Sequence, residues 1–464
     1  MPTCSDRVSD WVSRVRFGDL PQDVVTQTTL RVLDVVGLVL AGLATSFGRS
    51  VREAVLALNP AGPSRIFGCG DATTVPGAAF ANGALSQALE FDDTHNESIV
   101  HMSSPAVAAA FALAESRRTS GADLVTAIAI GNEISCRVGS VAPGQFHRRG
   151  YHPTGLFATF GATWLAGHML GLNRAEMNNA AGIAGSFASG LLQCWVDGTQ
   201  SKFLHPGWAA QSGIVAATLG KSGATGPAAV FEGRFGLFAS HLQDDSLPRA
   251  YGRITDGLGE HWESRNASFK PFPVAHVIHP YIDALLRLRA AHGIDPARVE
   301  RIICPVAAYI VGIVCEPVAE KRRPRSDSHG RVSLQYTLAE ALVLGRIDKN
   351  AYRPESLGDP RILGLADRVE IEVDPSFPGP ERFKGAVRVV MQDGSAYETV
   401  EEHNRGSAAN PLAVEDIIAK FDANAADLLS APQRRALVDA VMALPKARDA
   451  AAVVAHTIGL KATA

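Results

Sequence analysis

Apolar positions in the first half of the chain recur with helical spacing and are interrupted by short polar or glycine-containing stretches. Residues 21–45 predict a helix that opens with Pro21 and an acidic residue in its first turn. Its segment 24–43 is apolar nearly all round, which is typical of a buried helix. Further helices, rich in small residues that let backbones approach closely, are predicted at residues 51–58, 78–90, 106–115, 123–138, 156–170, 174–192 and 208–219.

The pattern changes near residue 265. Alternating apolar and polar positions indicate strands at residues 299–314, 368–373, 386–391 and 397–400. The alternation is weak at residues 299–314. Asp393-Gly394 separates the last two and is a strong signal for a hairpin turn. Helical spacing is found at residues 280–291 and 333–345, and it returns after Asn410-Pro411 at residues 414–421 and 432–444.

These segments predict a mainly α protein with an α+β insertion. We expect a large all-helical domain at residues 1–265, a smaller α+β lid domain at residues 266–408, and C-terminal helices at residues 409–464 that return to the helical domain. The length of 464 residues is compatible with two or three domains, at ~150 residues each. Apolar residues make up 46% of the chain, which is ordinary for a globular protein with a large core.

Charge and composition narrow the classes of partner. The formal net charge is −3 without a basic block, which argues against nucleic acid. The N-terminus lacks the basic and apolar regions of a signal peptide, and the most apolar run, residues 32–43, is short and contains Asp34. The six cysteines are scattered without a Cys-x-x-Cys pair. We therefore expect a reduced, cytoplasmic protein with no nucleic-acid and no membrane partner.

Common cofactor motifs do not occur in the sequence. It contains no Gly-x-x-x-x-Gly-Lys-Ser/Thr loop, no strand-linked Gly-x-Gly-x-x-Gly, no His-Glu-x-x-His and no Gly-x-Ser-x-Gly elbow. The 14 histidines show no local spacing of metal ligands. We expect neither a cofactor nor a metal.

Polar chemistry is concentrated in one stretch, Ala88-Leu89-Glu90-Phe91-Asp92-Asp93-Thr94-His95, followed by His101. His101 precedes Ser103-Ser104-Pro105 and hence a helix N-terminus, a position that disfavours imidazolium and leaves a neutral histidine able to act as a general base. The adjacent Asp92 and Asp93 cannot both face one site, so we expect one of them to be structural. The alternative is a helix end with solvated acids and a capping threonine.

Three later stretches repeat this chemistry. Tyr151-His152-Pro153-Thr154-Gly155 precedes an apolar helix, whose free N–H groups suit a carboxylate. Lys202 lies between Asp197-Gly198 and His205-Pro206-Gly207 and could bind a carboxylate or stabilise an enediolate. Lys270-Pro271-Phe272-Pro273 is followed by His276 and His279-Pro280, in a linker where an interdomain pocket can form. For the His152 stretch the alternative is a turn with an exposed histidine, and for the Lys202 stretch it is an ordinary surface lysine. For the Lys270 stretch the alternative is a linker without a site.

Taken in order, these motifs resemble the MmgE/PrpD family, which includes 2-methylcitrate dehydratases, cis-aconitate decarboxylases and iminodisuccinate epimerase. The resemblance covers nearly the whole chain, from Leu33-Asp34-Val35-Val36-Gly37 through Phe91-Asp92-Asp93-Thr94 to Ser333-Leu334-Gln335-Tyr336. The sequence of the motif Lys270-Pro271-Phe272-Pro273 resembles that of the epimerases and decarboxylases more than that of the dehydratases. The resemblance implies the fold expected above, a homodimer, and no metal or organic cofactor.

The resemblance also implies a site between the domains, formed by Asp93, Thr94, His101, His152, Lys202, Lys270, His279 and Tyr336. We expect His101 to move a proton as base or acid, with His152 or Tyr336 as its partner and Asp93 orienting a histidine or holding it protonated. Lys202 and Lys270 would hold the substrate and stabilise negative charge, and Thr94, Tyr151 and His279 would contact it.

The predicted function is a lyase or isomerase that transfers a proton at the carbon next to a carboxylate of a small di- or tricarboxylate. Loss of a β-hydroxyl would make it a dehydratase, loss of carbon dioxide a decarboxylase, and reprotonation on the opposite face an epimerase. A non-catalytic carboxylate-binding protein is the main alternative. A hydrolase that uses Ser103 or Ser104 with His101 is a further one.

Overall fold

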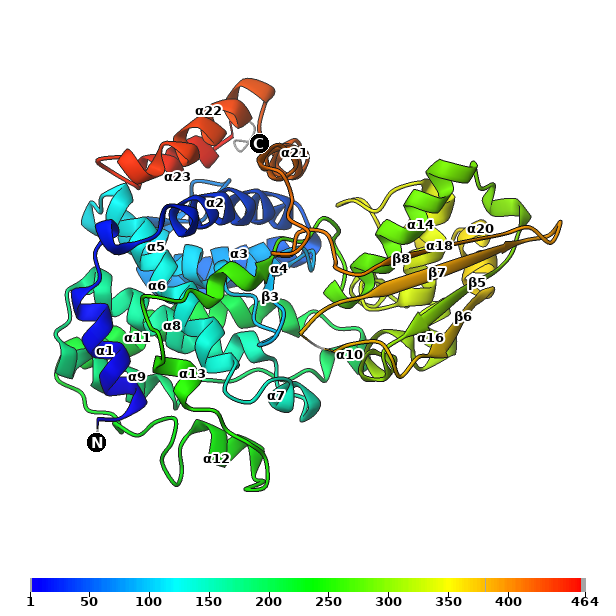
Figure 1. Ribbon diagram of the computed structural model, residues 1–464. Coiled ribbons are helices and arrows are strands. Elements are labelled where there is room, and N and C mark those ends of the chain that lie inside the picture. The colour runs from blue at the N-terminus through cyan, green and yellow to red at the C-terminus, as the bar shows by residue number, and fades with distance from the viewer. Residues whose placement is uncertain (1, 380, 460–464) are drawn as a thin grey trace.

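The computed structural model describes residues 2–379 and 381–459, and most of it is helical (Figure 1). Figure 1 shows two units side by side, which we call the helical unit and the α+β unit. The predicted fold class, mainly α with an α+β insertion, is confirmed. The helical unit begins with α1 (Cys4–Arg14), α2 (Gln22–Leu43), α3 (Ser46–Leu58), α4 (Val75–Gln87), α5 (Ser103–Arg117), α6 (Gly121–Gly139), α7 (Gln145–Arg148), α8 (Pro153–Leu170), α9 (Arg174–Ala184), α10 (Cys194–Asp197), α11 (His205–Lys221), α12 (Leu237–Leu242) and α13 (Gly252–Thr255).

Small residues bring the central helices of this unit together. A Cβ on Gly161 of α8 would lie 2.3 Å from the carbonyl oxygen of Gly131 in α6. A Cβ on Gly207 of α11 would lie 2.3 Å from the carbonyl oxygen of Phe80 in α4. Backbones this close leave no room for side chains, so the prediction of tightly packed helices is confirmed.

The helix α2 is a long, buried helix of the helical unit. By length and composition alone it could cross a membrane, because it has 22 residues and is strongly apolar. However, 89% of its most apolar stretch is buried inside the protein, as in a core helix. The apolar run that the sequence places at residues 32–43 is thus the second half of a longer helix.

The α+β unit is built on a four-stranded sheet in the order β6-β5-β7-β8. β5 and β6 are parallel, whereas β5–β7 and β7–β8 are antiparallel, and Gly394 forms the predicted hairpin turn with φ +83°. The strand predicted at residues 299–314 ends at residue 306, and the chain continues as helical turns. The elements are α14 (His279–His292), β5 (Val299–Val306), α15 (Ala308–Ile310), α16 (Val318–Arg322), α17 (Asp327–Gly330), α18 (Leu334–Leu344), α19 (Pro354–Leu357), α20 (Pro360–Ala366), β6 (Val369–Val373), β7 (Gly385–Met391) and β8 (Ala396–Glu401).

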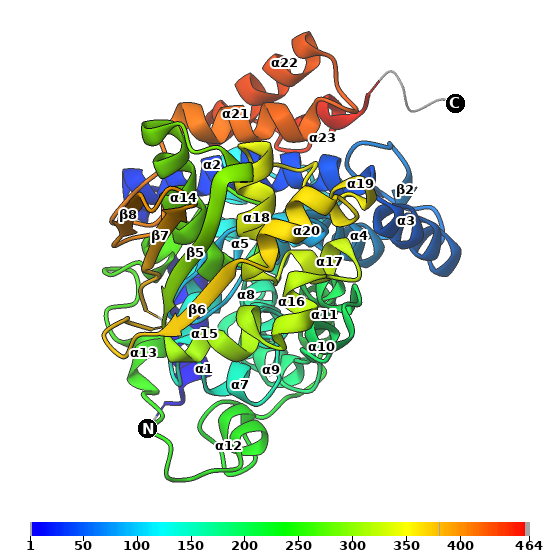
Figure 2. The ribbon, with the colours of Figure 1, turned by 90° about the vertical axis from the view of Figure 1, so that its right-hand side faces the viewer.

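The C-terminal helices α21 (Val414–Ala425), α22 (Ala431–Met442) and α23 (Ala452–Thr457) return to the helical unit and lie across α2 (Figures 1 and 2). The ring of Phe421 packs against Gly37, where a Cβ would approach the ring to 2.9 Å. Lys420 Nζ lies 2.7 Å from Asp34 Oδ1. The helical core therefore contains residues from both ends of the chain, while the α+β unit has a core of its own.

Two short strands join the units. β3 (Thr94–His95) pairs antiparallel with β4 (Ala267–Ser268), so the polar stretch after α4 lies beside the segment that enters the α+β unit. Arg331 of the α+β unit donates hydrogen bonds to the carbonyls of Leu89 (2.9 Å) and Pro273 (2.7 Å). These contacts fix residues 88–95 at the boundary between the two units.

Candidate active site

A cavity of about 80 Å³ lies between the helical unit and the α+β unit. A space of this size holds several water molecules or one small ligand. Its polar lining is formed by Glu90, Thr94, His101, His147, His152, Lys202, Lys270 and His276. Its apolar lining is formed by Ile99, Trp195, Ala275, Val277, Tyr309, Ile313 and Phe383.

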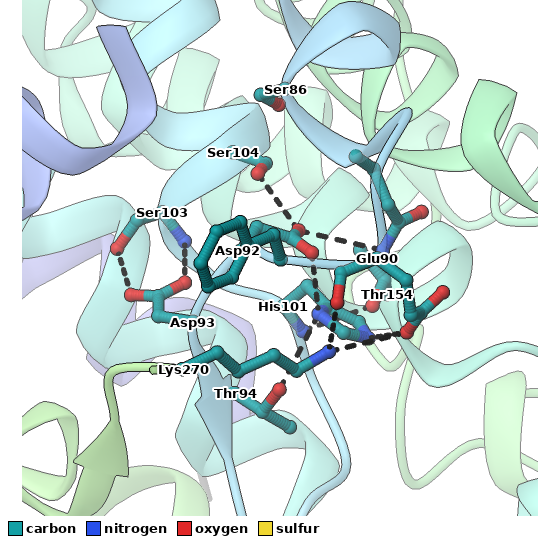
Figure 3. Close-up of polar contacts among 12 residues, drawn as sticks. Ser86, Glu90, Asp92, Asp93, Thr94, His101, Ser103, Ser104, Thr154 and Lys270 are labelled. Atoms are coloured by element: carbon teal, nitrogen blue, oxygen red, sulfur yellow. Dashed lines mark hydrogen bonds and ion pairs between the residues drawn. The ribbon is translucent and has the colours of Figure 1, made fainter. Parts of the chain in front are cut away.

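The polar stretch after α4 does not continue the helix, contrary to the prediction for residues 78–90. α4 ends at residue 87, and Glu90 takes a left-handed conformation with φ +53°, which is uncommon for a residue other than glycine. The chain then enters β3. The break turns the Glu90 side chain toward the cavity, where Figure 3 shows it beside Lys270 and His101.

Glu90 binds both lysines of the cavity. Lys202 Nζ lies 2.6 and 2.5 Å from its two carboxylate oxygens, and Lys270 Nζ lies 3.2 Å from Oε1 and 3.1 Å from the backbone carbonyl. Burial alone would raise the pKa of Glu90, but the two ammonium groups outweigh it and hold this pKa well below its usual range. Burial lowers the pKa of Lys270, and Glu90 opposes that shift. The cluster is therefore a buried carboxylate held between two cations.

His101 is oriented by groups on either side of its ring. Its Nδ1 lies 3.1 Å from Asp92 Oδ1, and its Nε2 lies 3.8 Å from Glu90 Oε1. Its backbone N–H donates to Thr154 Oγ1 at 3.0 Å, and Thr94 Oγ1 lies 3.4 Å from Nδ1. Because Asp92 engages Nδ1, the second ring nitrogen is left to exchange a proton with a bound molecule.

The structure contradicts the prediction that Asp93 orients a histidine. Asp93 accepts hydrogen bonds from Arg31 Nη1 (2.6 Å) and from the hydroxyl (2.5 Å) and backbone N–H (3.2 Å) of Ser103. Figure 3 shows Asp93 turned toward Ser103, while Asp92 is turned toward His101 and Ser104. Of the two adjacent aspartates, Asp92 thus serves the site, and Asp93 forms a buried ion pair at the start of α5.

His152 stands opposite His101, with 5.6 Å between the ring centroids. Its Nδ1 shares a hydrogen bond with His205 Nδ1 at 2.9 Å, and its buried Nε2 has no hydrogen-bond partner among the described residues. Burial, and then the charge of Lys202, lowers the pKa of His152 well below its usual value. The same two causes lower the pKa of His205 to about 4. His152 is therefore a neutral imidazole with a free nitrogen at the cavity.

Two further histidines line the cavity and were not assigned a role from the sequence. Burial, and then Lys202, lowers the pKa of His147 to about 4. Burial lowers the pKa of His276 well below its usual value, and Asn404 Nδ2 lies 2.9 Å from its Nε2. His147 follows a glycine-containing break and has no motif around it, whereas His276 lies in the Lys270 stretch that the sequence singled out.

Besides Asp93, three predicted site residues lie outside the cavity lining. Tyr336 is buried in the core of the α+β unit, where its hydroxyl has no partner among the described residues. His279 begins α14 and contacts the carbonyl of Val274 at 3.2 Å. Tyr151 packs against His241. The structure thus brings together Thr94, His101, His152, Lys202 and Lys270 at the cavity. Tyr151, His279 and Tyr336 do not line it.

Neither the hydrolase arrangement nor a metal centre is found in the part of the chain that the structure describes. The hydroxyl of Ser103 donates to Asp93, and that of Ser104 donates to Asp92 at 2.8 Å, so neither serine is paired with His101. No group of three or more His, Cys, Asp or Glu side chains among the described residues is arranged to hold a metal ion.

Comparison with protein families gives two adjacent matches. The MmgE/PrpD N-terminal domain matches residues 6–250, and the MmgE/PrpD C-terminal domain matches residues 272–444. The second match includes α21 and α22, which pack on the helical unit.

Several proteins with assigned activities are similar over most of their length. The cis-aconitate decarboxylase-like protein of Aspergillus oryzae is 26% identical over 97% of this chain and 96% of its own. Human cis-aconitate decarboxylase is 28% identical over 94% of this chain and 90% of its own. The 2-methylcitrate dehydratase of Salmonella typhimurium is 25% identical, over 63% of this chain and 61% of its own.

Proposed function

The chain belongs to the MmgE/PrpD family, and from this premise we propose that it is a lyase that transfers a proton at the carbon next to a substrate carboxylate. One observation carries the proposal: His101 and His152 face each other at 5.6 Å in a buried cavity that also contains Lys202 and Lys270. Two imidazoles at a carboxylate-binding site are the groups that acid/base chemistry requires near neutral pH.

We assign the roles from the contacts. Lys202 and Lys270 bind a carboxylate of the substrate and stabilise the negative charge that develops beside it. His101, held by Asp92, gives a proton to the carbon or takes one from it, and neutral His152 acts from the other side of the cavity. Glu90 keeps the two lysines in place, and its Oε1 lies 3.8 Å from His101 Nε2.

Decarboxylation is the branch that we propose. The similarity to cis-aconitate decarboxylases extends over 94–97% of the chain, whereas that to 2-methylcitrate dehydratases covers 63%. In the proposed step the C–C bond to a carboxylate breaks and carbon dioxide leaves. The electron pair shifts through the adjacent double bond, and His101 delivers a proton to the carbon next to a remaining carboxylate. Isomerisation without loss of carbon dioxide uses the same groups and differs only in product.

Proton NMR in D₂O tests the proposal with 2-methylcitrate, citrate, cis-aconitate and iminodisuccinate, with and without EDTA. Deuterium should appear at a carbon next to a carboxylate, and the product identifies the branch. Tight binding of one of these compounds without exchange or product would instead indicate a carboxylate-binding protein.

The variant His101→Gln should lower kcat by about 10²–10⁴-fold, because it removes the proton-transferring group but keeps a polar side chain of similar length. His95→Gln is the matched control, since His95 is also buried but bonds to Ser98 outside the cavity. Its kcat should stay within about threefold of the original protein. Equal kcat for the two variants would remove His101 from its role.

A further inference from the structure

The cavity has two chemically different walls. Glu90, His101, Lys202 and Lys270 form a charged wall on the helical side. The α+β unit contributes an apolar wall of Val277, Tyr309, Ile313 and Phe383, beside which the imidazole of His276 also lines the cavity. Ile99 and Trp195 of the helical unit also line the cavity. A ligand that fills the cavity thus meets charge at one end and apolar side chains at the other.

The positive charge of the cavity is limited. Among the described residues, Lys202 and Lys270 are the only lysines that line it, and no arginine does. Both lysines already bind the Glu90 carboxylate, and Asp92 is paired with His101, the group that delivers the proton. The buried cations and carboxylates therefore nearly cancel before any substrate enters.

The remaining histidines do not supply the missing charge. Burial and the nearby lysine or imidazole groups keep the pKa values of His147, His152 and His276 below neutral pH, so these rings are uncharged. A carboxylate buried without a cation is strongly disfavoured. A substrate with three carboxylates would have to place at least one of them against Tyr309, Ile313 and Phe383, where no cation among the described residues lines the cavity.

We propose that the substrate is a dicarboxylate that carries an apolar substituent in the position of the third carboxylate of a tricarboxylate. This inference rests on the proposed function and narrows its substrate class. One carboxylate binds at Lys202 and Lys270, the second is the group expelled as carbon dioxide, and the apolar substituent packs against Ile313 and Phe383. Burial of that substituent provides binding energy that a third carboxylate could not obtain there.

The test compares molecules that differ in one substituent. cis-Aconitate is glutaconate with a carboxylate at carbon 3, so 3-methylglutaconate and 3-isobutylglutaconate of the same double-bond geometry replace that carboxylate by an apolar group. Loss of carbon dioxide and proton uptake balance in the same way for all three. We expect kcat/KM to be at least tenfold higher for 3-isobutylglutaconate than for cis-aconitate. Equal or higher kcat/KM for cis-aconitate would overturn the inference and leave the proposed function standing.

A charge placed in the apolar wall should reverse the preference. Ile313→Arg supplies a cation where we place the apolar substituent, so the ratio of kcat/KM for cis-aconitate to that for 3-isobutylglutaconate should rise at least tenfold. Val373→Arg is the matched control, because Val373 lies exposed on β6 outside the cavity. Its ratio should be unchanged. An unchanged ratio in Ile313→Arg, with both compounds still turned over, would contradict the assigned wall.

Calorimetric binding of the same three compounds separates the two proposals. If no compound loses carbon dioxide or exchanges deuterium, but 3-isobutylglutaconate binds at least tenfold more tightly than cis-aconitate, the proposed reaction fails and the ligand class stands. If cis-aconitate binds as tightly or more tightly, or if none of the three binds, the ligand class is wrong.

Discussion

Adjacent residues in the polar stretch have different partners because the backbone between α4 and α5 is not helical. Asp92 contacts Ser104 and His101, which lines the cavity, whereas Asp93 pairs with Arg31 on α2. Both aspartates are buried, so each must have polar partners, and they find them on opposite sides of the chain. Sequence proximity alone could not assign the two roles.

Substitution of each aspartate by asparagine should separate activity from stability. Asp92→Asn should lower kcat at least about tenfold while the fold is retained, because His101 loses the carboxylate that orients it. Asp93→Asn leaves the buried Arg31 without its counter-charge and should lower the free energy of unfolding by about 3–5 kcal/mol. Urea unfolding and steady-state kinetics on both variants measure these effects. A reversed pattern, with Asp93→Asn inactive but stable, would show that the roles are exchanged.

Five of the eight polar residues that line the cavity, Thr94 among them, could be recognised from their motifs, and the other three could not. His101, His152, Lys202 and Lys270 each stand in a motif with prolines or glycines that mark a fixed backbone, and the fold brings all four to one cavity. Glu90 stands in the first motif, but the pattern of apolar residues predicts that it ends a helix. Its position in the cavity depends on a left-handed backbone conformation that the pattern of apolar residues does not reveal.

At the scale of elements, turn residues and apolar periodicity predict the secondary structure correctly where one local signal dominates. The Asp393-Gly394 pair predicts the turn between β7 and β8, and the structure has it. The stretch 299–314 was less reliable because valine and isoleucine suit both strands and buried helices. It contains β5 followed by α15 and further helical turns.

The hairpin offers a test of this turn. Gly394→Ala should lower the free energy of unfolding by about 1–2 kcal/mol, because φ is +83° and an L side chain is strained there. Gly364→Ala in α20 is the control: its Cβ also meets no atom within 4 Å, but its φ is not positive. That variant should be unchanged or up to about 1 kcal/mol more stable. Urea unfolding measures both, and equal effects would show that the turn conformation does not matter.

At the scale of the whole molecule, the two ends of the chain meet around the site. Lys420 of α21 binds Asp34 of α2 and donates a hydrogen bond to the carbonyl of Phe91 at 2.8 Å. Arg331 holds the neighbouring carbonyl of Leu89 from the α+β unit. The polar stretch is therefore fixed by three parts of the chain that are far apart in sequence.

The Asp34–Lys420 pair should make stability depend on pH. Burial outweighs Lys420 and raises the pKa of Asp34 from 3.8 to about 6. Between these two values the folded protein binds a proton at Asp34 that the unfolded chain releases, so the contribution of this group to stability increases as pH falls from about 6 to 4. Compared with Asp34→Asn, the original protein should gain unfolding free energy between pH 7 and pH 4.5. Urea unfolding across this range measures the difference, and a gain in the opposite direction would mean that the Asp34 pKa is lowered.

The sequence by itself determined most of the helices, the hairpin turn and the motifs that carry the chemistry, because each depends on residues close together in the chain, and the order of these elements indicated the fold class. Only the tertiary structure decided which side chains share the cavity. It replaced Asp93 by Asp92, added Glu90, His147 and His276, and left Tyr336 in a core. Burial and contact depend on how separate elements pack, and the apolar wall from the α+β unit, on which the substrate class rests, exists only once the two units meet.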